Sequence, residues 1–138
     1  MNVSRVLVTA LIALMQTSAP PRSIDKSARS DITSPRQVVI RTQGEWDALW
    51  REHMPSRQRE AIDFSKEMVV GVFLGSRPTA GYGVAIESAV EADGVLHVRY
   101  RETSPARDAM TAQVITFPYH LVAIPKSAAT DVTLDKVR

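Results

Sequence analysis

The chain has 138 residues, of which 44% are hydrophobic, and it contains no cysteine. Its 17 basic and 15 acidic residues give a net charge of +2 at pH 7. Because no one-sided run of lysine and arginine stands out, the composition speaks against a nucleic-acid partner. This length is room for one domain. Without cysteine, neither a disulfide nor the acylated cysteine of a lipoprotein can form, so the core must stabilise the domain unaided.

Residues 1–19 are predicted to be a secretory signal peptide. Arg5 supplies a short positive region, the apolar run over residues 6–15 follows, and Gln16–Ala19 resembles a cleavage region. About ten apolar residues are too few for a membrane span, which needs roughly 20. The alternative is a buried N-terminal strand, and Pro20 leaves the cleavage position open. We expect export to a bacterial periplasm or medium, with no stable membrane span after cleavage.

Residues 20–36 are predicted to be a disordered leader. The segment is rich in Ser, Pro, Asp and Arg, and its apolar residues, such as Ile24 and Ile32, are scattered. Such a composition buries too little apolar surface to offset the entropy of an ordered chain. The folded domain is therefore expected to span residues 37–138.

One amphipathic helix is predicted over Gln43–His53. Thr42 and Glu45 have the spacing of a capping box, which marks the start of a helix. Aromatic and apolar residues then recur at helical spacing. We expect its two tryptophans to anchor it to the core rather than to bind a ligand. His53 is expected at the C-terminus, where a partly cationic ring would suit the helix dipole.

The rest of the chain predicts β-strands. Val38–Ile40 is a short strand, and the apolar run Met68–Leu74 indicates a central strand buried on both faces. Further strands are expected at residues 82–91, 96–101, 112–117, 119–124 and 132–137, with Pro118 interrupting the ladder. The predicted fold is α+β: a mainly antiparallel β-sheet of about six or seven strands with one short N-terminal helix.

The turn at Asp93-Gly94 joins two of these strands. A two-residue turn would pair Ala92 with Val95 and place apolar Val90 opposite a polar residue, mixing the two faces of the sheet. A three-residue turn, Ala92–Gly94 with Gly94 at positive φ, keeps the faces uniform and is therefore predicted. Its expected pairs are Val90 with Leu96, Ile86 with Tyr100 and Glu87 with Arg99.

Neither a catalytic set nor a metal site is visible in the sequence. His53, His97 and His120 have no second ligand at the spacing of known metal motifs. Ser76 is the one serine in a suitable turn, and its surroundings do not match the Gly-x-Ser-x-Gly pattern. We therefore expect no catalytic residue, no metal and no cofactor. His97 is expected on the solvent face, and His120 either in the core or on the surface. An enzyme acting near Ser76 or His120, and a metal site assembled from distant parts of the fold, are the alternatives left open.

The segment Gly75–Tyr82 is the candidate binding site. Pro78 fixes its own φ, and Gly81 permits a backbone shape that is closed to other residues. It is either a rigid turn between strands or a preformed loop that presents Arg77 and Thr79 to a partner. The second interpretation predicts a protein interface made of Arg77, Pro78, Thr79, Gly81, Tyr82 and Tyr119.

Several of these residues carry a resemblance to a known family. The tryptophan helix, the turn Arg77–Tyr82, Pro105 and the segment Pro118–Pro125 resemble the C-terminal domain of PrcB, a protease complex subunit. Many members have a second glycine where this chain has Ala80. The resemblance covers about residues 38–126. It implies a non-catalytic exported binding or scaffold module whose partner is a protein, such as an exported protease or another envelope protein.

A second resemblance supplies an alternative. Pro78–Tyr82 is similar to the Pro-Thr-Thr-Gly-Tyr loop of the chagasin-type inhibitors of papain-like cysteine proteases, β-sandwiches that insert three loops into the protease cleft. The companion glycine-rich loop is missing here. Ser104-Pro105 and Phe117-Pro118 do not reproduce the later Arg-Pro-aromatic loop. The implied alternative is a proteinase inhibitor that acts through Pro78–Tyr82.

Overall fold

The computed structural model describes residues 20–138, so the predicted signal peptide over residues 1–19 lies outside the described part. Within the described part, seven strands and one helix form two sheets and a covering layer. The elements are β1 (Arg22–Ser27), β2 (Arg36–Ile40), α1 (Gln43–His53), β3 (Glu67–Phe73), β4 (Gly83–Ala92), β5 (Val95–Thr103), β6 (Tyr119–Pro125) and β7 (Asp131–Val137). The first sheet has the order β1-β6-β3-β2 and the second the order β4-β5-β7. The single sheet of the sequence prediction is therefore wrong, whereas the mainly β, one-helix composition is confirmed.

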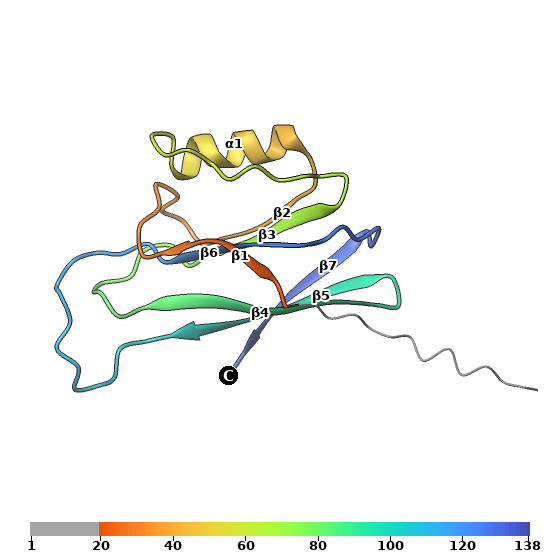
Figure 1. The fold of residues 1–138 in the computed structure, drawn as a ribbon. Helices are drawn as coiled ribbons and strands as arrows, with labels where there is room; N and C mark the ends of the chain where they lie inside the picture. Colours follow the sequence, from red (N-terminus) through yellow and green to blue (C-terminus); the bar gives the residue numbers. More distant parts are fainter. Residues whose placement is uncertain (1–19) are drawn as a thin grey trace, which may run out of the picture.

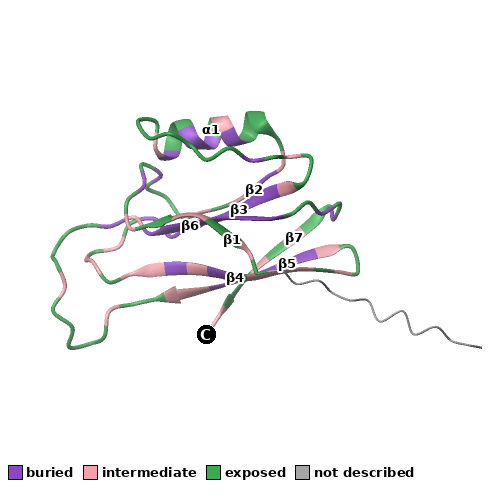
Figure 2. Ribbon diagram, viewed as in Figure 1, coloured by how far each residue is buried: buried purple, intermediate pink, exposed green. Residues whose placement is uncertain are grey.

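The first sheet is the middle layer, with α1 on one face and the second sheet on the other (Figure 1). Strand β3 is buried on both faces, as predicted, because successive side chains point to opposite sides of a strand. Val70 and Val72 pack into the core between the sheets. Val69 and Phe73 pack with the tryptophans of α1. Figure 2 shows the buried residues concentrated in the middle layer, with others in α1, β4 and β5.

Helix α1 has the predicted bounds and buries the predicted face. Thr42 is its N-cap, and the Thr42 Oγ1 accepts a hydrogen bond from the Glu45 backbone N–H at 3.2 Å. The side chains of Trp46, Leu49, Trp50 and His53 are buried. The helix follows β1 and β2 in the chain, so its predicted place at the N-terminus of the domain is wrong.

Residues 20–36 are not a disordered leader. Strand β1 pairs with β6, from Arg22 opposite Ala123 to Ser27 opposite Tyr119, and Ile32 is buried. The composition of this segment predicted disorder because it contains little apolar surface. The segment is stabilised mainly by backbone hydrogen bonds to β6 and by the contacts of the Asp25 carboxylate. The domain therefore begins well before residue 37.

The β4–β5 hairpin turns through two residues, and the predicted three-residue turn is wrong. Ala92 pairs with Val95, and both Asp93 and Gly94 have positive φ, at 54° and 75°. This is the backbone of a type I′ turn, whose twist suits a hairpin. Gly94 does have the positive φ that was expected of it.

A bulge between Ile86 and Ser88 explains the failure of the register argument. The extra residue exchanges the two faces of β4 part-way along the strand. On the turn side, Val90 lies opposite His97, the mixed pair that seemed unfavourable. Beyond the bulge, Ile86 pairs with Tyr100 as predicted. The bulged Glu87 forms its ion pair with Arg101, at 2.8 Å, instead of lying opposite Arg99.

Two further differences concern the end of the chain. The predicted strand over residues 112–117 is part of a long loop with one isolated bridge, Thr116 to Arg77. Strand β7 pairs with β5 in parallel, so the second sheet is mixed. Within residues 20–138, no helix is long and apolar enough to cross a membrane.

Candidate protein-binding surface

Two connections between the sheets lie side by side at one end of the molecule. One is the turn Gly75–Tyr82, which leads from β3 to β4, and the other is the loop Ser104–Phe117, which leads from β5 to β6. We call the two together the two-loop surface. Phe73 at the end of β3 pairs with Tyr119 at the start of β6. The other ends of both connections are paired too, through the first residue of β4 and the last of β5. The ladders therefore bring the two connections together (Figure 1).

Hydrogen bonds join the two loops into one unit. The Arg77 backbone N–H donates to the Thr116 carbonyl at 2.8 Å, and the Thr116 N–H returns a bond to Arg77 at 2.9 Å. The Ala80 N–H donates to the Ala112 carbonyl at 3.1 Å. The Thr116 hydroxyl also donates to the Thr79 carbonyl at 2.9 Å. The turn and the loop therefore present a preformed shape.

Gly81 lets the turn approach the loop closely. Its φ is +96°, and a Cβ built on it would lie 2.9 Å from the Pro105 Cβ. Any other residue would both strain the backbone and press on the proline ring. The sequence interpretation of Gly81 as a position closed to other residues agrees with this geometry.

The loop exposes three large apolar side chains. The exposed fractions are 101% for Met110, 49% for Val114 and 62% for Ile115, and they are the large hydrophobic residues exposed within the described part of the chain. Single exposed apolar residues are ordinary, whereas contiguous apolar patches are typical of interaction sites, so this loop is the candidate. Their exposure was not predicted, because Val114 and Ile115 fall in a segment whose sequence resembles a strand.

The structure brings together five of the six predicted interface residues. Pro78 and Gly81 are exposed in the turn, and Arg77, Thr79 and Tyr82 are partly buried there. Tyr119 is wrong as an interface residue because its side chain is fully buried. Its hydroxyl donates to the Asp25 Oδ2 at 2.8 Å. Burial, reinforced by this hydrogen bond, raises the pKa of Tyr119.

The Arg77 side chain is turned back onto its own chain. Its Nη1 donates to the carbonyls of Leu74 at 3.0 Å and Ser76 at 3.1 Å. Its Nη2 lies 3.9 Å from the Glu102 carboxylate. Arg77 and Glu102 line an open pocket of about 590 Å³ beside the two-loop surface. Arg77 therefore holds the base of the turn, and a partner would meet the rest of the two-loop surface first.

A buried polar network ties β1 to the helix. The Ser30 hydroxyl lies 2.7 Å from the His53 Nδ1, and the Asp25 Oδ2 lies 3.1 Å from the His53 Nε2. The ionised Asp25 can only accept, so Nε2 carries the proton and Nδ1 accepts from Ser30. Sequence spacing gave no sign of this Ser-His-Asp arrangement. The His53 ring has no exposed surface, so the arrangement serves the fold.

The environment of His53 differs from the expected one. His53 is the last residue of α1, as expected. Burial lowers the pKa of its ring, and this effect outweighs the hydrogen bond and the charge of Asp25, which raise the pKa. The prediction of a partly cationic ring is therefore wrong. His97 lies on the outer face of β5, as expected, with its Nδ1 3.1 Å from the Thr133 hydroxyl.

His120 is the second buried histidine and it connects three strands. Its Nδ1 accepts the Ile86 backbone N–H at 2.9 Å, which joins β6 to β4 in the other sheet. Its Nε2, which must then carry the proton, donates to the Ser23 hydroxyl of β1 at 2.9 Å. Burial lowers the pKa of His120 to about 4, and the charge of Lys26 adds to this effect. Among residues 20–138, no three His, Asp or Glu side chains are grouped to hold a metal ion.

The sequence of this region matches one known family. The model of the PrcB C-terminal family matches residues 68–125, which run from the second residue of β3 to the last residue of β6. The resemblance seen in the sequence is therefore confirmed over residues 68–125, and the tryptophan helix lies outside the matched range. The matched range contains both connections of the two-loop surface. No curated protein and no solved structure matches the chain.

Proposed function

We propose, from the PrcB C-terminal family pattern that residues 68–125 carry, that this chain is a non-catalytic exported binding module. It stabilises a protease or another envelope protein complex. The family supports association with a protease complex. The export half of the proposal rests on the signal-like sequence of residues 1–19.

The observation that carries the proposal is the exposure of Met110, Val114 and Ile115 on the two-loop surface. Burying one such side chain in a partner contributes about 1.5–3 kcal/mol. Interfaces concentrate their binding energy in a few side chains of this kind. Three of them within six residues supply an apolar centre, and the polar residues of the turn Gly75–Tyr82 supply a rim.

The rigidity of the two loops favours binding as well. Ordering a flexible loop on association costs conformational entropy. A preformed loop is already ordered, so most of this cost does not arise on binding. Backbone hydrogen bonds between Arg77 and Thr116 and the close contact of Gly81 with Pro105 hold the surface before any partner arrives.

The test is quantitative affinity capture from the envelope fraction of the source bacterium, with the captured proteins identified by mass spectrometry. The variant Met110→Ser/Ile115→Ser should recover at least about tenfold less of the partner than the wild-type chain. The matched control, Ala48→Ser/Ala128→Ser, changes two exposed residues outside the two-loop surface and should recover the wild-type amount. Equal recovery by all three chains would refute the proposal.

Activity assays separate this proposal from its alternatives. A binding module leaves the activity of the captured protease unchanged and lengthens its lifetime. A proteinase inhibitor acting through Pro78–Tyr82 would instead block a papain-like protease and weaken on Thr79→Arg. Turnover of a substrate by the purified chain, abolished by one polar substitution near Ser76 or His120, would identify an enzyme.

A further inference from the structure

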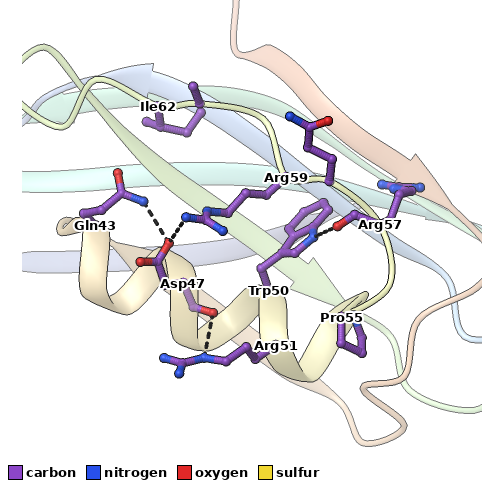
Figure 3. Close-up of a pocket in the computed structure, with 10 residues that line it drawn as sticks. Gln43, Asp47, Trp50, Arg51, Pro55, Arg57, Arg59 and Ile62 are labelled. Atoms are coloured by element: carbon purple, nitrogen blue, oxygen red, sulfur yellow. Dashed lines mark hydrogen bonds and ion pairs between the residues drawn. The ribbon is translucent and has the colours of Figure 1, made fainter.

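A groove runs between helix α1 and the loop that follows it, away from the two-loop surface. It has a volume of about 470 Å³, within the range of ligand sites. We call it the helix–loop groove (Figure 3). Polar and charged side chains dominate its lining: Gln43, Asp47, Arg51, Arg57, Gln58 and Arg59, with Trp50, Pro55, Ala61 and Ile62 completing it.

The loop side of the groove is held in place by the two tryptophans. The Trp50 indole N–H donates to the Arg57 carbonyl at 2.6 Å, and the Trp46 indole N–H donates to the Glu60 carbonyl at 3.0 Å. Both rings are buried, and Ile62 packs into the same core. The backbone of the loop is therefore fixed, although most of its side chains are exposed.

The helix side of the groove is a line of polar residues. Gln43, Asp47 and Arg51 are spaced four residues apart, so they lie along one face of α1. The Gln43 amide donates to the Asp47 Oδ1 at 2.9 Å, and the Arg59 Nη2 lies 2.8 Å from the same oxygen. Figure 3 shows Arg59 reaching across the groove to this line.

The arginines of the groove differ in how they are engaged. Arg57 is bonded to the carboxylate of Asp25 and lies over the Trp50 ring, 5.4 Å from its centroid. Arg59 has one ion pair, to Asp47. Arg51 donates its Nε to the Asp47 carbonyl at 3.3 Å. Among residues 20–138, no carboxylate lies within ion-pair distance of Arg51. Arg57 pairs with a carboxylate that is only 11% exposed, whereas the carboxylate that pairs with Arg59 is 34% exposed. Arg51 and Arg59 are therefore the cations that are more open to an incoming anion.

We propose that the helix–loop groove binds an extended, acidic peptide segment through these two arginines. Guanidinium groups bind carboxylates in a paired, planar geometry. The Asp47 carboxylate and the side-chain amides of Gln43 and Gln58 provide acceptors and donors for a peptide backbone. The proposal does not depend on the two-loop surface, because the groove residues lie before the matched range 68–125.

A peptide fits the charges of the groove better than a nucleic acid does. A phosphate backbone requires a continuous run of cations, and here Asp47 stands between the arginines. The chain as a whole carries only +2. A peptide with separated acidic side chains can place its carboxylates on the arginines and its N–H groups near Asp47.

The test measures the fluorescence anisotropy of a labelled hexaglutamate peptide titrated with the protein, beside a hexaglutamine peptide. We expect the glutamate peptide alone to bind, with an affinity that weakens as salt rises. Arg51→Ala/Arg59→Ala should raise its Kd at least about tenfold. The control Arg99→Ala/Arg107→Ala removes the same charge from exposed residues outside the groove and should leave the Kd unchanged. Circular dichroism verifies that each variant is folded.

Three results would overturn the proposal. Absence of binding, or equal binding of the glutamine peptide, would show that the groove does not recognise carboxylates. Equal weakening by both double variants would show attraction to overall charge alone. A thymidine oligonucleotide that binds more tightly than the peptide, and through the same two arginines, would assign the groove to nucleic acid.

Discussion

Lowering the pH should weaken the hydrogen bond by which His120 connects the two sheets. Its Nδ1 must stay unprotonated to accept the Ile86 N–H, and burial lowers its pKa from 6.5 to about 4. Above pH 6.5 the ring is neutral in both the folded and the unfolded chain. Between pH 6.5 and 4 the unfolded chain binds the proton first, so the free energy of unfolding falls as pH falls.

The size of this loss follows from the two pKa values. The gap between 6.5 and about 4 corresponds to about 3 kcal/mol, reached at and below pH 4. This is a large share of the stability of a small domain. His53 adds a loss of the same sign, because burial lowers its pKa too. The contribution of His120 therefore has to be isolated by substitution.

The substitution His120→Gln isolates the contribution of His120 to the pH dependence of stability. A glutamine amide can accept the Ile86 N–H with its oxygen and donate to Ser23 with its nitrogen, but it does not titrate. Urea unfolding between pH 7.5 and 4.5, followed by the fluorescence of the two buried tryptophans, measures the effect. From pH 7.5 to 4.5 we expect the variant to lose about 2–3 kcal/mol less stability than the wild type. His97→Gln, on the outer face of β5, should retain the wild-type pH dependence. Parallel curves for His120→Gln and the wild type would refute the reasoning.

Three other substitutions test the rest of the structure. Asp25→Asn should cost about 2–3 kcal/mol in urea unfolding, because the carboxylate accepts from Tyr119, His53 and Arg57 in a site that is only 11% exposed; an unchanged midpoint would contradict the network. Gly81→Ala should cost about 1–2 kcal/mol, since the residue has positive φ and its Cβ would meet Pro105. Gly94→Ala has positive φ but open space and should cost less, so equal losses would exclude the proline contact. A chain that begins at residue 37 lacks β1 and should melt at least about 10 °C lower than one that begins at residue 20. Equal melting temperatures would show that residues 20–36 do not stabilise the domain, as expected of a disordered leader.

Short-range patterns predicted their elements well. Helix α1 was predicted with its bounds because capping at Thr42 and the spacing of Trp46, Leu49 and Trp50 act within a few residues. The continuous apolar run of β3 similarly indicated burial on both faces. In the candidate site, Pro78 and Gly81 were identified because their backbone restrictions belong to the residues themselves.

Contacts between distant residues decided the rest. Nothing near Asp25 in the chain reveals that His53 and Tyr119 close around it, so β1 was predicted as disordered. The bulge at Glu87 exchanges the faces of β4, and alternation alone does not locate such a bulge. Val114 and Ile115 look like strand residues, yet they are exposed because the loop bonds to the turn Gly75–Tyr82 instead of to a sheet.

The mainly β composition, the helix with its buried face, and the stiff turn that contains Arg77 and Tyr82 could all be predicted from the sequence. These depend on propensity, periodicity and backbone restrictions, which are local properties. Contacts between distant segments determined that the strands divide into two sheets, that Tyr119 is in the core and that Pro105 and Thr116 lie against the turn. Each of these is a pairing between residues far apart in the chain, and such pairing is set by packing, which no short stretch of sequence records.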